Sequence, residues 1–123
     1  MKTFSFEKLE VWKKAIVLTK MIYKATLSFP KNEKYGLISQ MKRSCISIPS
    51  NISEGSGRKS GKDKARFTEL SYSSAMELLN QLIISKQLNF LSEQEYKPIR
   101  NQISEIAAML NALHKAQLKT VNS

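Results

Sequence analysis

Residues 47–62 read SIPSNISEGSGRKSGK, and this stretch decides the fold. Its first half continues the apolar spacing of a helix in spite of Pro49, and its second half gathers three glycines and three positive charges. A phosphate-binding loop would follow the pattern G-x-x-x-x-G-K and then Ser or Thr, between a strand and a helix. Here an aspartate follows Gly61 and Lys62, the first glycine of the pattern is missing, and no strand pattern precedes. The stretch therefore predicts a helix that bends at Pro49 and ends among the glycines.

A polar stripe runs beside the core face of this predicted helix, because successive residues of a helix are about 100° apart around its axis. Glu54 and Arg58 stand four residues apart, a spacing that suits an ion pair. The polar groups should be satisfied by hydrogen bonds within the bundle or across a contact between subunits. The stripe consists of Arg43, Ser47, Asn51, Glu54 and Arg58, and the core face consists of Leu37, Met41, Cys45, Ile48 and Ile52.

The glycines and Ser60 mark the end of this helix and the start of the next. Gly55 and Gly57 are expected to adopt the left-handed conformation that closes a helix. Ser60 is expected to cap the following helix with its hydroxyl. The free backbone amides at that start, next to several lysines and arginines, would attract a phosphate group. A solvated helix start and a protein interface are the alternatives for these charges.

Working outward, the rest of the chain also has the three- and four-residue spacing of helices. Four helices joined by short links predict an all-α fold, an antiparallel up-down-up-down four-helix bundle. The first helix is predicted over residues 6–28 and ends at Phe29 and Pro30. The second helix is predicted to start at residue 32 or 33, and the third to run from residue 60 or 61 to residue 88. The fourth helix follows a capping box of Ser92 and Glu95.

We expect a single domain over residues 1–123, with an ordered core over residues 6–117 and a frayed tail over residues 119–123. The apolar face of the first helix is wide enough for burial on two sides. It combines one stripe of Leu9, Trp12, Ile16, Thr19 and Tyr23 with a second of Val11, Ala15, Leu18, Ile22 and Ala25. The buried set of the third helix is predicted as Phe67, Leu70, Ser74, Ala75, Leu78 and Leu82, with Ile83 beside it, and that of the fourth as Tyr96, Ile99, Ile103, Ile106, Leu110 and Leu113.

The net charge of +10 lies entirely in the first half of the chain. Residues 1–66 contain 15 Lys and Arg against 5 Asp and Glu, whereas residues 67–123 contain 5 of each. Such an asymmetry favours a polyanionic partner, most often a nucleic acid, although surplus lysine also aids solubility. The candidate nucleic-acid contacts are Arg58, Lys59, Lys62, Lys64 and Arg66, then Lys42 and Arg43, and then Lys13 and Lys14.

Several other function classes find no support in the sequence. The N-terminus is charged and has no apolar run, which is unlike a signal peptide, and no window is long and apolar enough to span a membrane. The one cysteine, Cys45, favours a reducing cytoplasm and lies on the core face as a small apolar side chain. The one histidine, His114, has no clustered ligands or nucleophile around it. We therefore expect a cytoplasmic protein that is not an enzyme and holds no metal and no cofactor.

Three segments carry a resemblance to a known family: FEKLEVWKKAIVLTKMIYKATLSFP (residues 6–30), EKYGLISQMKRSCISIPSNISEGSGRKS (residues 33–60) and ARFTELSYSSAMELLNQL (residues 65–82). They resemble the four-helix-bundle proteins that are encoded in intervening sequences of bacterial 23S ribosomal RNA genes, over about residues 4–115. The positions that fit the family pattern in order are Trp12, Phe29, Pro30, Tyr35, Gly36, Leu37, Arg43, Ser47, Ile48, Pro49, Asn51, Ile52, Glu54, Gly55 and Arg58. Ser53 stands where family members usually have alanine.

This resemblance implies a four-helix bundle that assembles into a ring-shaped homopentamer, and it supplies no defined biochemical activity. A related group of proteins, the accessory variability proteins of diversity-generating retroelements, serves a reverse transcriptase. Two hypotheses follow. In the first, a homo-oligomeric bundle binds structured RNA or DNA through its basic first half, by phosphate contacts with modest sequence specificity. In the second, the same basic face docks a protein partner, such as a reverse transcriptase.

Overall fold

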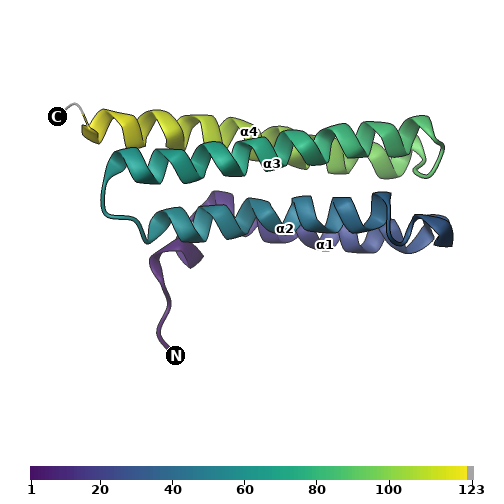
Figure 1. Cartoon of the computed structure of the whole chain (residues 1–123), viewed down its shortest axis with the longest axis horizontal. Coiled ribbons are helices and arrows are strands. Elements are labelled where there is room, and N and C mark those ends of the chain that lie inside the picture. Colours follow the sequence, from purple (N-terminus) through teal and green to yellow (C-terminus); the bar gives the residue numbers. More distant parts are fainter. Residues whose placement is uncertain (122–123) are drawn as a thin grey trace.

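The computed structural model describes residues 1–121, which form four α-helices and no strand. Figure 1 shows two layers, with α1 and α2 side by side in one layer and α3 and α4 in the other. Contacts between α1 and α2, α2 and α3, α3 and α4, and α1 and α4 close the bundle. The prediction of an all-α fold with four helices is confirmed. The helices are α1 (Glu10–Ala25), α2 (Leu37–Ser56), α3 (Gly61–Gln87) and α4 (Glu93–Val121).

The buried core lies between the two layers and confirms most of the predicted apolar faces. In α1 the second of the two predicted stripes is buried, whereas Trp12 of the first stripe is half-buried and Tyr23 is exposed. The core is therefore built from one stripe of each helix. Its large members are Val11, Leu18 and Ile22 of α1, Met41, Ile48 and Ile52 of α2, Leu78 and Leu82 of α3, and Ile99, Ile103, Ile106 and Leu110 of α4.

The ends of the first two helices differ from the sequence prediction. Residues 5–8 form a short 3-10 helix, η1 (Ser5–Lys8), and α1 begins only at Glu10 because the backbone of Leu9 is extended. After α1 the chain passes through η2 (Thr26–Ser28) and reaches an extended Phe29, the conformation that a following proline favours. The predicted start of the second helix at residue 32 or 33 is wrong: those residues belong to η3 (Lys31–Glu33), and α2 starts after Gly36.

The predicted buried face of the third helix is wrong at its first half. Phe67 is half-buried and Leu70 is 42% exposed, while the small residues Thr68 and Ser71 are buried in their place. At Ser71 the reason is the close approach of α2, because this small side chain contacts the α2 backbone directly. The Ser71 hydroxyl donates a hydrogen bond of 2.9 Å to the carbonyl oxygen of Ile48 on α2.

Helix α2 continues through Pro49 as one element. Proline lacks the amide hydrogen that would bond to the carbonyl oxygen of Cys45 four residues earlier. The hydroxyl of Thr19 on α1 donates its shorter hydrogen bond, of 2.9 Å, to the carbonyl oxygen of Ala15 and lies 3.4 Å from the Cys45 oxygen. A polar side chain of the neighbouring helix therefore lies next to the carbonyl group that proline leaves without its helical partner.

The left-handed conformation predicted for Gly55 and Gly57 is wrong, since no glycine has a positive φ among residues 1–121. Gly57 has φ −83° and ψ −7° at the end of α2. Gly55 is buried, and a Cβ atom placed on it would lie 2.7 Å from the Cβ of Phe67 on α3. Gly55 is therefore required by the contact between two helices, not by a turn.

Both predicted helix caps are confirmed. The Ser60 hydroxyl accepts a 3.1 Å hydrogen bond from the Asp63 amide at the start of α3. Ser92 and Glu95 form the capping box before α4, with the Ser92 amide 3.1 Å from the Glu95 carboxylate and the Glu95 amide 3.2 Å from the Ser92 hydroxyl. Residues 119–121 continue α4 and residues 122–123 lie outside the described residues, so the frayed tail stays a prediction.

Candidate nucleic-acid interface

The two candidate lysines of the first helix are both ion-paired. Lys13 lies 3.4 Å from the carboxylate of Glu10 on the same helix. Lys14 reaches across to α4, where its ammonium lies 2.9 Å from the carboxylate of Glu105. An acidic group at this distance offsets most of the field that a lysine presents to a distant phosphate. These two side chains therefore contribute little to a phosphate-binding surface.

The two candidates in the middle of α2, Lys42 and Arg43, also contact other side chains. The Lys42 ammonium lies over the ring of Tyr23 on α1, 4.7 Å from its centroid. The Arg43 guanidinium lies 3.8 Å from the Glu77 carboxylate on α3, which also accepts a 2.6 Å hydrogen bond from the Ser44 hydroxyl. Glu77 thus joins an arginine and a serine of α2 to α3. Arg43 has the geometry of a residue that holds two helices together.

Arg58 follows the end of α2 and makes two contacts of its own. Its guanidinium lies 3.7 Å from the Glu54 carboxylate, which is the ion pair expected from their spacing. The same guanidinium lies over the ring of Phe67 on α3, 4.5 Å from the centroid. Stacking on an aromatic ring and pairing with a carboxylate fix this side chain across the α2–α3 connection.

The rest of the polar stripe forms hydrogen bonds within α2 and one from α2 to α3. The Ser47 and Ser74 hydroxyl oxygens are 2.8 Å apart, and the Asn51 amide donates to the Ser47 carbonyl oxygen at 2.9 Å and to its hydroxyl at 3.1 Å. With Arg43 and Glu77 at one end and Arg58 and Phe67 at the other, the stripe lies along the α2–α3 contact. Its polar groups form their hydrogen bonds within the bundle, which is one of the two arrangements expected from the sequence.

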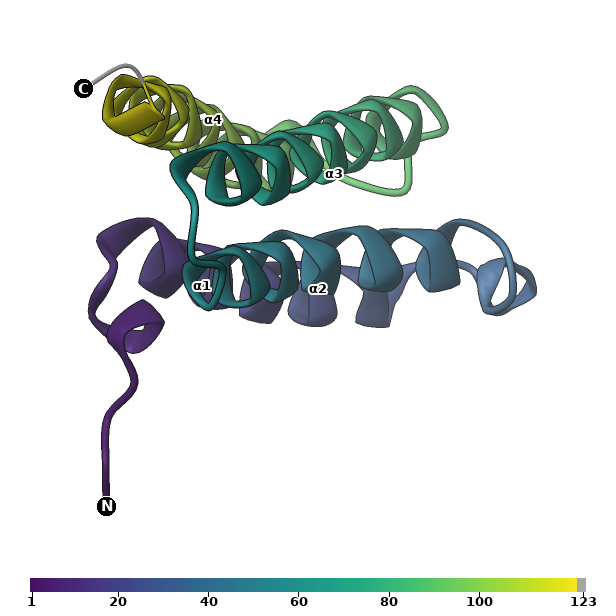
Figure 2. The same cartoon turned by 60° about the vertical axis from the view of Figure 1, so that its left-hand side comes forward.

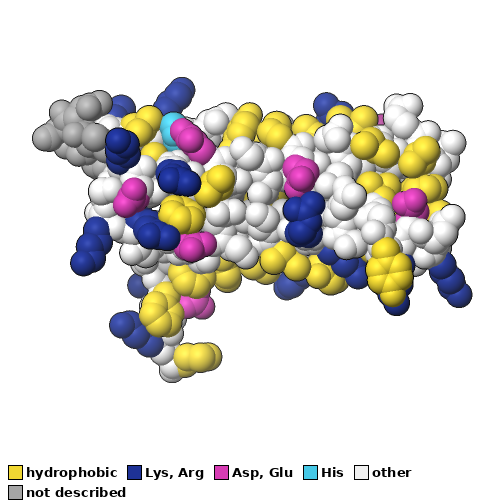
Figure 3. All heavy atoms as spheres, in the orientation of Figure 1, with side chains coloured by type: hydrophobic (Ala, Val, Ile, Leu, Met, Phe, Trp, Pro, Cys, Tyr) yellow, Lys and Arg dark blue, Asp and Glu magenta, His cyan; other side chains and the backbone are white. Residues whose placement is uncertain are grey.

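The remaining four candidates form what we call the basic cluster: Lys59, Lys62, Lys64 and Arg66. Within residues 1–121 none of the four is ion-paired. They follow one another through the α2–α3 connection and the first turns of α3, where Asp63 is the only acidic residue. Figure 3 shows Lys and Arg side chains gathered at the end of the molecule that contains this connection. The structure thus separates the nine candidates into a paired group and an unpaired cluster.

Two hollows flank the basic cluster on opposite sides of α3. One has a volume of about 440 Å³ and is bounded by the residues around Leu9, the end of α2, the start of α3 and the end of α4, with Lys59 and Lys64 among its lining residues. The other has a volume of about 390 Å³ and is lined by Arg58, Asp63, Arg66, Phe67 and Leu70. The cluster therefore presents cations to two adjoining concave surfaces. The larger hollow joins residues that are far apart along the chain, so no sequence pattern indicates it, whereas the smaller one lies within residues 58–70.

Cys45 and His114 are the side chains that could serve in catalysis, and both have structural roles. Burial raises the pKa of the Cys45 thiol from 9.0 to about 11, in a core position, so the thiolate is disfavoured. The ring of His114 on α4 lies 2.9 Å from the Glu69 carboxylate on α3, a partner that the sequence did not reveal. Among the described residues, no group of three or more His, Cys, Asp or Glu side chains could hold a metal ion.

No helix within residues 1–121 has the length and apolar content needed to cross a membrane.

Fold and surface together define a small all-α protein with a four-helix core and a basic end. The chain belongs to the 23S rRNA-intervening sequence protein family, whose model matches residues 7–112. The family resemblance expected from the sequence is thereby confirmed, while the link to the retroelement accessory proteins stays a prediction. None of the curated proteins matches the chain.

A solved structure has a similar fold. It is the crystal structure of a protein of unknown function from the S23 ribosomal protein family of Bacteroides thetaiotaomicron, with a TM-score of 0.77 and 23% sequence identity. The match covers 85% of this chain and 98% of that chain. At this level of identity the similarity establishes the shared fold and carries no information about activity.

Proposed function

We propose that the protein is a non-enzymatic homo-oligomer that binds structured nucleic acid, with RNA favoured over DNA, through the basic cluster. The observation that carries the proposal is that Lys59, Lys62, Lys64 and Arg66 have no acidic partner within residues 1–121, whereas Lys13, Lys14, Arg43 and Arg58 do. Unpaired cations on adjoining concave surfaces can neutralise phosphates and release counterions. RNA is favoured because the family is named for intervening sequences of 23S rRNA.

Self-association is proposed through the outer face of α1 and α2. This face carries Ile46, which is 43% exposed, and a hollow of about 300 Å³ lined by half-buried Trp12 and Ile16 together with Pro49 and its neighbours. Apolar side chains on one face of a small protein are typical of an interface between copies. Figure 3 shows hydrophobic side chains following the edge of the molecule where α1 and α2 lie. We propose a ring of five copies, the number that the family resemblance implies.

The ring strengthens the nucleic-acid proposal, because it repeats a weak basic cluster several times on one assembly.

Three further features belong to the same proposal. The helices follow an antiparallel up-down-up-down order, which the alternating ends of their connections in Figure 1 support. Helix α2 bends at Pro49, where a backbone hydrogen bond is lost. The protein acts in the cytoplasm, without metal or cofactor.

Fluorescence anisotropy with a labelled RNA hairpin tests the role of the basic cluster. One variant replaces Lys59, Lys62, Lys64 and Arg66 by glutamine, and a matched control replaces Lys13, Lys14, Lys42 and Arg43, so both lose four positive charges. We expect the cluster variant to bind at least about tenfold more weakly than the control. If both variants lose the same amount of affinity, the loss depends only on the total charge of the protein, and this result would contradict the proposal. If the unaltered protein does not bind RNA or DNA even at low salt, the basic cluster is a docking face for a protein such as a reverse transcriptase.

A further inference from the structure

The larger hollow beside the basic cluster is a cleft with mixed chemistry. It has a volume of about 440 Å³, which lies within the range of small-ligand sites. It lies at the end of the bundle that holds both termini, between the two layers of helices (Figure 2). None of its twelve lining residues is acidic.

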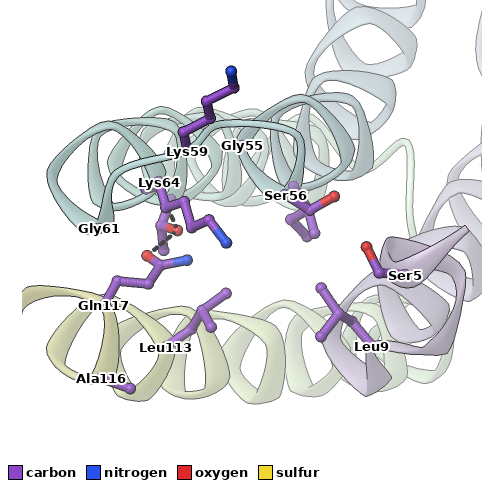
Figure 4. A pocket seen from close by; sticks show the side chains of 12 residues that line it. Ser5, Leu9, Gly55, Ser56, Lys59, Gly61, Lys64, Leu113, Ala116 and Gln117 are labelled. Carbon is purple, nitrogen blue, oxygen red and sulfur yellow. Dashed lines mark hydrogen bonds between the residues drawn. The ribbon is translucent and has the colours of Figure 1, made fainter. Parts of the chain in front are cut away.

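The walls of the cleft are largely apolar, and one cation points into it. Leu9, Ile52 and Leu113 supply aliphatic surface from α2, α4 and the turn before α1. In Figure 4 the Lys64 ammonium points into the cleft, whereas Lys59 points away from it at the rim. Lys64 is half-buried and forms no ion pair with the described residues. The cleft therefore offers a positive charge next to an uncharged, apolar surface.

The shape of the cleft is held by contacts at its base. The Thr68 hydroxyl on α3 lies 2.6 Å from the side-chain oxygen of Gln117 on α4 and 3.1 Å from the Lys64 carbonyl oxygen. Thr68 is buried and Gln117 is half-buried, so this link between α3 and α4 lies at the inner wall of the cleft. It fixes the two helices whose Lys64 and Leu113 side chains face the cleft, as Figure 4 illustrates. A cleft of fixed shape favours a ligand that fits this shape over anions of other shapes.

We infer that the cleft receives an unpaired nucleotide of the bound RNA, with its phosphate at Lys64 and its base against Leu9 and Leu113. This inference rests on the proposed function and specifies which part of a structured RNA the basic end recognises. A base in a duplex cannot enter the cleft without leaving its stack, whereas a bulged base is already available. The remaining cations of the basic cluster then contact the flanking phosphates.

The test compares two RNA hairpins of equal stem length, one fully paired and one with a single-nucleotide bulge. We expect the protein to bind the bulged hairpin about tenfold more tightly, since the cost of unstacking a base is avoided. Lys64→Gln and Lys62→Gln form a matched pair, because both remove one charge from the first turns of α3 and only Lys64 lines the cleft. Lys64→Gln should abolish the preference for the bulge, and Lys62→Gln should weaken both hairpins equally.

A second pair of variants fills the cleft without changing charge. Ala116→Leu adds volume at a lining residue, and Ala112→Leu adds the same volume one turn earlier on α4, at an exposed position outside the cleft. Only Ala116→Leu should lower the preference for the bulged hairpin. Equal affinity for the two hairpins, or a preference that survives both Lys64→Gln and Ala116→Leu, would overturn the inference and leave the proposed function intact. A lack of binding to either hairpin would overturn both.

Discussion

At the scale of single residues, Gly55 determines how closely α2 and α3 approach each other. A Cβ atom at this position would lie 2.7 Å from the Cβ of Phe67, a distance that cannot be relieved by rotating a side chain. At Gly57, two residues on, the nearest atom to an added Cβ is the Glu54 carbonyl oxygen at 3.5 Å, which is an ordinary contact. The two glycines therefore differ in what they contribute, although they lie in the same short motif.

Replacing Gly55 by alanine should destabilise the protein in spite of the better helix propensity of alanine. The propensity gain is about 1 kcal/mol, and the overpacking against Phe67 costs about 1–3 kcal/mol. We expect the free energy of unfolding in urea to fall by about 1 kcal/mol in Gly55→Ala. Gly57→Ala is the matched control, and it should leave the stability unchanged or slightly higher. Equal effects of the two substitutions would show that the close approach at Gly55 does not matter.

The thiol of Cys45 gives a second prediction at this scale. Burial raises its pKa from 9.0 to about 11, so between pH 9 and pH 11 the unfolded chain loses a proton that the folded chain keeps. The free energy of unfolding should therefore fall with rising pH in this interval, by about 2–3 kcal/mol in total. Urea unfolding at several pH values, compared with Cys45→Ala, isolates this contribution because the other titrating groups are shared. Parallel curves for the two proteins would exclude it.

At the scale of helices, the outer face of α1 and α2 and the outer face of α3 each expose an isoleucine. Ile46 on α2 is 43% exposed and lines the hollow that contains Trp12 and Pro49, whereas Ile84 on α3 is 40% exposed and lines none of the three hollows described above. The two residues are equally apolar and nearly equally accessible. Only their surroundings distinguish an interface from an isolated apolar side chain.

Ile46→Glu should dissociate the oligomer, and Ile84→Glu should not. A charge at the centre of an apolar contact between copies loses its hydration with no partner to replace it. Light scattering coupled to size exclusion measures the outcome. We expect a mass well above 14.0 kDa for the unaltered protein and for Ile84→Glu, and 14.0 kDa for Ile46→Glu. A mass of 14.0 kDa for the unaltered protein would remove both the ring and the contribution of avidity.

The helix ends indicate what a sequence can predict at this scale. Ser60, Ser92 and Glu95 act on backbone groups within a few residues, so their caps were predicted correctly from spacing alone. The buried face of α3 depends on its distance from α2, which a sequence does not contain. Large apolar residues such as Phe67 and Leu70 therefore looked more suitable for the core than Ser71, although only a small side chain fits there.

At the scale of the whole molecule, the same limit applies to the candidate site. The nine candidate cations lie on α1, α2, the α2–α3 connection and α3, but Glu105 and Glu77, the partners of Lys14 and Arg43, are distant in sequence. Pairing across the bundle separates Lys14 and Arg43 from the four residues of the basic cluster, which have no ion pair within residues 1–121. The sequence places the excess charge in the first half of the chain, and the fold brings four of its unpaired cations together around the α2–α3 connection.

The most direct test of the nucleic-acid proposal is the salt dependence of RNA binding. Four phosphate contacts made by one basic cluster predict that the logarithm of Kd rises with the logarithm of salt concentration with a slope of about 3.6, and each further cluster of the ring that contacts the same RNA adds to the slope. Anisotropy titrations of the unaltered protein with an RNA hairpin, across a series of salt concentrations, yield this slope. The variant that replaces Lys59, Lys62, Lys64 and Arg66 by glutamine should have a slope lower by about that amount. A slope that is near zero, or that is the same in the protein and the variant, would contradict phosphate binding by the basic cluster.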